Sequence, residues 1–79
     1  MSPRYSQDNP FAREREVLGE TIEKLRRGHK MTQEELAEKS SINVSYLAKI
    51  ENGYVNTTIR YLIKIARGLK VKVKDLFDF

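Results

Sequence analysis

The chain has 79 residues, a length typical of one domain, and its 15 Lys plus Arg against 11 Asp plus Glu give a net charge of +4. The absence of cysteine excludes disulfide bonds and thiolate metal sites, and no apolar run approaches the roughly 20 residues that cross a bilayer. We therefore expect a soluble, cytoplasmic domain without a signal peptide, held together by core packing or by a partner subunit.

Residues 1–12 contain two prolines and an asparagine and show no regular period, which predicts an N-terminal arm that is partly flexible. A helical domain is predicted over residues 13–79. Two basic residues near the start of the chain, Arg4 and Arg13, fit either a contact with a nucleic-acid backbone or disorder.

The first helix is predicted to begin near Ala12 or Arg13 and to end at Gly28, because apolar residues recur at helical spacing: Val17, Leu18, Ile22 and Leu25. A second, short helix is predicted after Thr32. The hydroxyl of Thr32 and the carboxylate of Glu35 stand at the spacing of a capping box, which favours a helix start at this point.

The third and fourth helices also follow capping residues. Asn43 precedes a helix whose inward face is predicted to comprise Tyr46, Leu47 and Ile50. This helix is predicted to end at Asn52 and Gly53, because Gly enters the left-handed conformation of a helix stop without strain. Thr58 precedes a helix whose apolar side is predicted to comprise Ile59, Leu62, Ile63, Ala66 and Leu69.

A short fifth helix is predicted around residues 74–77, and no alternating apolar pattern is long enough to predict a strand. The expected fold class is therefore all-α, a compact bundle of five short helices around one small core. The residues assigned to this core are Leu18, Ile22, Leu36, Leu47, Ile50, Leu62 and Ala66.

The second and third helices are separated by only a few residues, a spacing typical of a helix-turn-helix and also found in plain helical bundles. Small Ala37 suits the point where two helices cross, and Ile42 can anchor the turn. The sequence "MTQEELAEKSSINVSYLAKIENG" (residues 31–53) resembles the helix-turn-helix of the phage lambda Cro/repressor-like, or XRE, family. The stretches "LRR" (residues 25–27) and "NTTIRYLIKIARGLKVKVKDLF" (residues 56–77) resemble the family's other helices.

The resemblance implies a lambda-repressor-like domain that binds double-stranded operator DNA as a homodimer, with its third helix in the major groove. It assigns Gln33 to a phosphate contact that also braces the third helix. It assigns base contacts to Val44, Ser45 and Lys49, whose side chains suit a thymine methyl or the hydrogen-bonding edges of bases. Contacts to the DNA backbone are implied for the polar residues at and after the end of the third helix, Asn52, Asn56 and Thr57.

Glu51, in the third helix, matches a family glutamate that pairs with an arginine of the first helix, which here is Arg26. The resemblance thus implies a partly buried ion pair that fixes the orientation of the third helix. Four positions depart from the family: Ser41 and Lys70 stand where Gly is usual, Lys72 stands at the cap of the fifth helix, and Thr57 replaces the proline before the fourth helix. A non-Gly residue in left-handed conformation costs on the order of 1 kcal/mol.

Large apolar residues close the chain, and the family dimerises near this end. We expect Leu76 or Phe77 to join the core and the tail to contribute to a two-fold interface. The residues assigned to this dimer interface are Leu76, Phe77 and Phe79.

An enzyme is not expected, because His29 is the only histidine and would have to serve every Ser–His–acid or Cys–His arrangement. Asp75 and Asp78 stand three residues apart without a His or Cys beside them. Neither a metal site nor a cofactor is therefore predicted.

The leading prediction is a small transcriptional regulator that recognises a palindromic operator. The stretches "MTQEELAEKSS" and "NTTI", with Tyr46, are most similar to restriction–modification controller proteins, which control their own operon. An antitoxin or a protein-interaction module of the same fold is the alternative, since the third helix carries only one basic residue, Lys49. RNA polymerase or a toxin would be a further protein partner.

Overall fold

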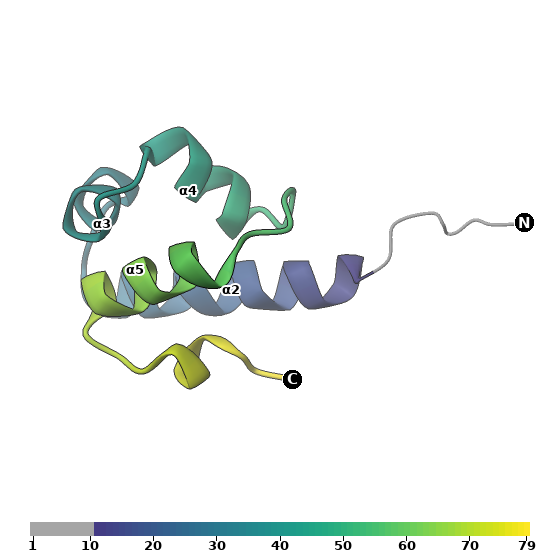
Figure 1. The fold of residues 1–79 in the computed structure, drawn as a ribbon. Helices are drawn as coiled ribbons and strands as arrows, with labels where there is room; N and C mark the ends of the chain where they lie inside the picture. Colours follow the sequence, from purple (N-terminus) through teal and green to yellow (C-terminus); the bar gives the residue numbers. More distant parts are fainter. Residues whose placement is uncertain (1–10) are drawn as a thin grey trace, which may run out of the picture.

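The computed structural model describes residues 11–79, and the predicted arm, including Arg4, lies outside this range apart from its last two residues. Within the described range the chain is all-helical and contains no strand. Its elements are α2 (Ala12–Gly28), α3 (Gln33–Ser40), α4 (Val44–Glu51), α5 (Ile59–Leu69) and the 3₁₀ turn η1 (Val73–Leu76) (Figure 1). None of the helices in this range is long and apolar enough to cross a membrane.

Side-chain caps determine where three of the helices begin, as the sequence predicted. Thr32 and Glu35 form the complete capping box at the start of α3, with hydrogen bonds of 3.1 and 2.8 Å. The Asn43 carboxamide oxygen accepts hydrogen bonds from the backbone N–H groups of Ser45 and Tyr46 in the first turn of α4. Thr58 accepts one from the backbone N–H of Tyr61 at 3.3 Å. Each cap satisfies N–H groups that have no partner within the helix.

The prediction of a fifth helix needs a correction: residues 11–79 contain four α-helices, and the fifth element is a single 3₁₀ turn of four residues. The Asp75 carboxylate accepts a hydrogen bond from the Lys72 backbone N–H at 3.0 Å, which closes this one turn. The Lys72 side chain makes no capping hydrogen bond, since an ammonium group has no acceptor. Four residues are too few to develop the hydrogen-bond ladder of an α-helix.

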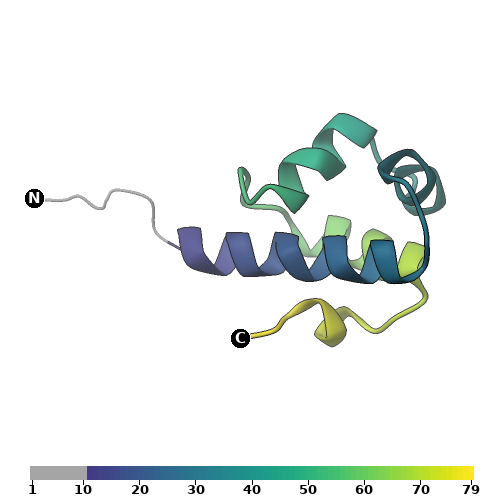
Figure 2. The same cartoon turned by 180° about the vertical axis from the view of Figure 1, so that it is seen from behind.

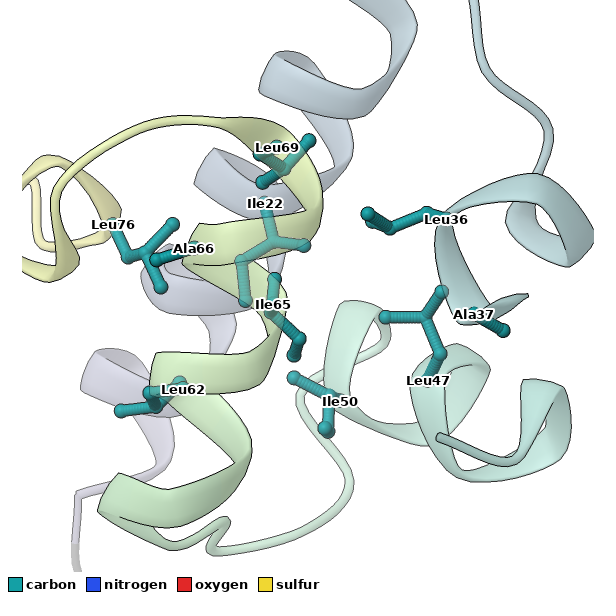
Figure 3. Close-up of a cluster of buried hydrophobic side chains, with 10 residues drawn as sticks. All are labelled: Ile22, Leu36, Ala37, Leu47, Ile50, Leu62, Ile65, Ala66, Leu69 and Leu76. Carbon is teal, nitrogen blue, oxygen red and sulfur yellow. The ribbon is translucent and has the colours of Figure 1, made fainter. Parts of the chain in front are cut away.

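The helices α3 and α4 lie on one side of α2 and α5, and η1 lies on the opposite side (Figures 1 and 2). Ten buried apolar residues fill the space between these elements (Figure 3): Ile22, Leu36, Ala37, Leu47, Ile50, Leu62, Ile65, Ala66, Leu69 and Leu76. Leu18, predicted in the core, is half-buried at its edge.

The buried face of α5 differs from the predicted one at three isoleucines. Ile63, predicted on this face, is half-buried and is not among the residues that form the core or pack against it. Ile65 is completely buried although the prediction omitted it, whereas Ile59 is 64% exposed. The reason is that Ile59 is the first residue of α5, while the later turns of this helix supply the core. Ile59 therefore remains a large apolar side chain on the surface.

Two glycines allow helices to approach one another closely. A methyl group on Gly19 of α2 would overlap the backbone carbonyl of Glu51 at the end of α4. A methyl group on Gly68 of α5 would overlap the hydroxyl of Ser40 at the end of α3. The sequence did not predict a packing role for either glycine, because no neighbouring residue in the chain indicates a close tertiary contact.

Candidate nucleic-acid interface

The helix α4 presents one polar face outward and one face to the core. Leu47, Ile50 and Glu51 are buried, while Ser45, Lys49 and Asn52 are exposed. The exposed three are spaced four and three residues apart, so they share one side of the helix and its C-cap. A hydroxyl, an ammonium and a carboxamide on one open face match the groups that hydrogen-bond the edges of bases and phosphates.

Val44, which the sequence assigned to a base contact, is only half-buried and half-exposed. Its side chain packs against the core, as does Ile42 in the preceding turn. Part of the Val44 side chain thus stabilises the helix-turn-helix itself, and the rest is available at the start of the outward face.

The opposite face of α4 is held by a buried polar network. Arg26 donates from Nε to Glu51 Oε2 at 2.8 Å and from Nη2 to Glu51 Oε1 at 3.1 Å. The side-chain amide of Gln33 donates to Glu51 Oε1 at 2.9 Å, and Arg26 Nη1 donates to the carbonyl of Met31 at 2.8 Å. The network therefore ties α4 to α2, to the loop before α3 and to the first residue of α3.

The charges of this network are matched within the protein. Arg26 and Glu51 are 7% and 6% exposed, which for charged residues requires close pairing. Hydrogen bonding to Glu51 raises the pKa of Arg26 above its ordinary value, against the opposing effect of burial. Arg26 therefore stays protonated and keeps its positive charge in the pair. Gln33 contributes its amide to this brace; its predicted phosphate contact stays a prediction.

The loop after α4 is fastened to the first turns of α2. Arg15 Nε donates to the carbonyl of Gly53 at 3.1 Å, and Arg15 Nη1 donates to the carboxamide oxygen of Asn56 at 3.4 Å. Gly53 has a left-handed φ of 74°, which Gly adopts without strain. Sequence reasoning assigned Asn56 to the DNA backbone but missed Arg15, since these partners are 41 residues apart.

The comparisons with known proteins agree with this geometry. Residues 22–76 match the family model HTH_3, a helix-turn-helix. The chain belongs to this XRE-type helix-turn-helix family of DNA-binding transcription regulators. The resemblance to that family predicted from the sequence is thereby confirmed.

Several relatives are similar to the chain over most of their own length, whereas others, such as the immunity repressor of Bacillus phage phi105, are matched over 42% of it. An HTH-type transcriptional regulator of Archaeoglobus fulgidus is 38% identical over 58 residues, which are 73% of this chain and 83% of that protein. The control protein C.BamHI of Bacillus amyloliquefaciens is 33% identical over 64 residues, 80% of this chain and 79% of that protein. The crystal structure of the restriction–modification controller protein C.AhdI from Aeromonas hydrophila matches with a TM-score of 0.79 at 28% identity, covering 80% of this chain and 96% of that one.

Two departures from the usual sequence of this helix-turn-helix family have the backbone conformation expected for them. Ser41, in the turn between α3 and α4, has φ 57°, and Lys70, after α5, has φ 60°. Both are left-handed, a conformation that favours Gly. The ammonium group of Lys64 lies 3.5 Å from the carbonyl oxygen of Ser41, so α5 supports this turn from one side.

The end of the chain corrects one assignment to the dimer interface. Leu76 is completely buried in the core of the single chain, so its side chain is not available to a partner. Phe77 and Phe79 are exposed, with their rings in edge-to-face contact at 5.8 Å between centroids. They line a mainly apolar groove, called the apolar groove below, together with Phe11, Leu18, Val55, Ile59 and Leu62. Its remaining lining residues are polar: Glu14, Arg15, Asn56 and Thr57.

Proposed function

We propose that the chain is a sequence-specific regulator that binds a palindromic operator as a homodimer, with α4 in the major groove. One observation carries the proposal: Ser45, Lys49 and Asn52 lie exposed on α4, while the other face of this helix is fixed by the Arg26–Glu51 pair. A recognition helix needs both properties. Its polar side chains must be accessible to the bases, and its orientation must be fixed so that these side chains reach them.

The apolar groove supports the homodimer. Two of its aromatic side chains, Phe11 and Phe79, are 70% and 67% exposed, and Ile59 is 64% exposed. A monomer of this size rarely leaves such a cluster open to water, whereas a two-fold contact would bury it against the same surface of a second copy. Two joined copies would present two α4 helices to the two halves of a palindrome.

The similarity to C.BamHI and C.AhdI, both named as controllers of restriction–modification systems, supports a narrower proposal. The chain would then regulate the operon of such a system. It spans 79% of C.BamHI and 96% of the C.AhdI chain, so these relatives offer no large additional domain for comparison. A neighbouring pair of methyltransferase and endonuclease genes would be consistent with this role, and a neighbouring toxin gene would contradict it.

A binding experiment tests the proposal directly. The full chain is titrated onto a duplex from upstream of its own gene and onto an unrelated duplex of equal length, at several salt concentrations. We expect tighter binding to the upstream duplex and an affinity that falls steeply with salt. Binding that does not distinguish the two duplexes would contradict a sequence-specific regulator.

Two lysine variants then locate the interface. Lys49→Ala is expected to lose about 1–3 kcal/mol of discrimination at particular base pairs. Lys74→Ala removes the same charge from η1, on the side of the molecule opposite α4, and should retain that discrimination. An equal loss from Lys49→Ala on every sequence would restrict Lys49 to a phosphate contact.

A further inference from the structure

Tyr54 is the exposed aromatic residue that the groove does not explain. In the described part of the chain five large apolar side chains are exposed, and four of them line the groove: Phe11, Ile59, Phe77 and Phe79. Tyr54 is the most exposed of the five, at 74%, and it is not part of the groove lining. Tyr54 therefore presents a phenol ring to solvent outside the groove, beside the end of α4.

The backbone at Tyr54 is held in place on two sides. Its N–H donates to the carbonyl of Lys49 at 2.9 Å, and the N–H of Gly53 donates to the carbonyl of Ile50 at 3.0 Å. The Gly53 carbonyl in turn accepts the hydrogen bond from Arg15, so the loop is fixed to α4 and to α2. The loop projects beside the end of α4, on the side away from α3 (Figure 1).

We propose that Tyr54 is a further DNA contact, and that Arg15 is the residue that positions it; the inference rests on the proposed function. A ring at the end of a helix in the major groove meets the sugar–phosphate backbone that borders the groove. The flat apolar face of Tyr54 packs on a deoxyribose, and its hydroxyl donates to a phosphate oxygen. Tyrosine is among the side chains that make such backbone contacts, and these contacts carry no sequence information.

Two variants at Tyr54 separate the ring from the hydroxyl. Tyr54→Phe removes one neutral hydrogen bond and is expected to weaken binding about threefold, while Tyr54→Ala also removes the ring contact and should weaken it about tenfold. Both losses should be equal on the upstream duplex and on the unrelated duplex. The slope of affinity against salt should not change, because no charge is removed.

A third variant tests the role of Arg15. Arg15 also lines the apolar groove, so the binding of its variants is compared at concentrations where sedimentation shows the same association state as for the unmodified chain. If Arg15 acts through the loop, Arg15→Met weakens binding in the chain with Tyr54 but adds little in the chain with Tyr54→Ala, and the salt slope stays the same. A slope reduced by about one would mean that Arg15 itself neutralises a phosphate, which would overturn its positioning role. An additive loss in the double variant would overturn it as well.

The outcomes also distinguish this inference from the proposed function. If the unmodified chain binds and Tyr54→Ala binds equally well, the Tyr54 contact is wrong and the regulator stands. If Tyr54→Ala changes the association state in sedimentation, Tyr54 contacts protein and the inference is overturned. If the unmodified chain binds no duplex, both proposals fall. Circular dichroism of each variant verifies that the helices are retained.

Discussion

Two faces of helix α2 meet opposite kinds of chemistry. On one face, Gly19 and Arg26 meet α4 in a contact where the backbones approach closely and both charges are paired. On a second face, Leu18, together with Phe11 just before the helix, borders the apolar groove, where large apolar side chains are exposed. The first region is completed by the chain itself, whereas the second still requires apolar surface from outside. The contrast separates the contact that holds α4 in place from the surface that the proposed homodimer would bury.

Breaking the buried ion pair is expected to have the largest effect. Glu51→Gln leaves the Arg26 charge buried without its partner, which should lower the free energy of unfolding by about 3–5 kcal/mol. Urea unfolding followed by circular dichroism measures this loss. Operator affinity should fall too, because α4 loses its brace.

A neighbouring pair on the same helix provides the matched control. Arg27 and Glu23 are also 2.8 Å apart, but their side chains are 70% and 38% exposed. Glu23→Gln should therefore change stability by less than about 1 kcal/mol, since water screens and replaces the interaction. Equal effects of the two Glu→Gln variants would contradict the structural role given to Glu51.

Adding a methyl group at Gly19 tests how tightly α2 and α4 are packed. Gly19→Ala forces the two backbones apart and should cost about 1–3 kcal/mol of stability. Gly28→Ala, in the last turn of the same helix, meets no atom within 4 Å. It should be neutral or stabilising by up to about 1 kcal/mol, as Ala is the better helix former. If Gly19→Ala left the free energy of unfolding unchanged, the contact between α2 and α4 would have to be able to widen without cost.

The groove is tested by a substitution that the single chain should tolerate. Ile59→Ala is expected to change monomer stability by less than about 0.5 kcal/mol, because Ile59 is 64% exposed. It should weaken self-association roughly tenfold, as apolar surface buried against the second copy is lost. Sedimentation over a range of concentrations measures this. Tyr54→Ala, at a position that is 74% exposed but outside the groove, is the control that should leave association unchanged.

The starts of the helices could be predicted from local chemistry, whereas the tertiary contacts could not. Thr32, Asn43 and Thr58 each accept hydrogen bonds from backbone N–H groups two or three residues ahead. Their capping role therefore depends only on nearby residues of the sequence. In α5 the apolar residues cover a wide arc, and the pattern alone does not choose between Ile59 and Ile65. That choice depends on where the neighbouring helices lie.

In the candidate site, too, some features could be predicted from the sequence and others could not. The motif located the exposed face of α4, and the pair between Arg26 and Glu51 is present as the family resemblance implied. Arg15 and Gly53 are 38 residues apart and no pattern joins them, so this brace appears only in the folded chain. Leu76 was placed in the interface because three apolar residues close together offered no means of deciding which one the core would take.

The smallest expected effect concerns the turn after α5, which belongs neither to the contact with α4 nor to the apolar groove. Lys70 is exposed with φ 60°, so Lys70→Gly removes backbone strain and should raise the free energy of unfolding by up to about 1 kcal/mol, reduced by the greater entropy of Gly in the unfolded chain. Lys72 is also exposed, carries the same charge and has φ −83°. Lys72→Gly relieves no strain and should instead destabilise by roughly 0.5–1 kcal/mol. The urea midpoints of the two variants should therefore shift in opposite directions. Shifts of the same sign would show that charge, rather than backbone conformation, determines the stability of this turn.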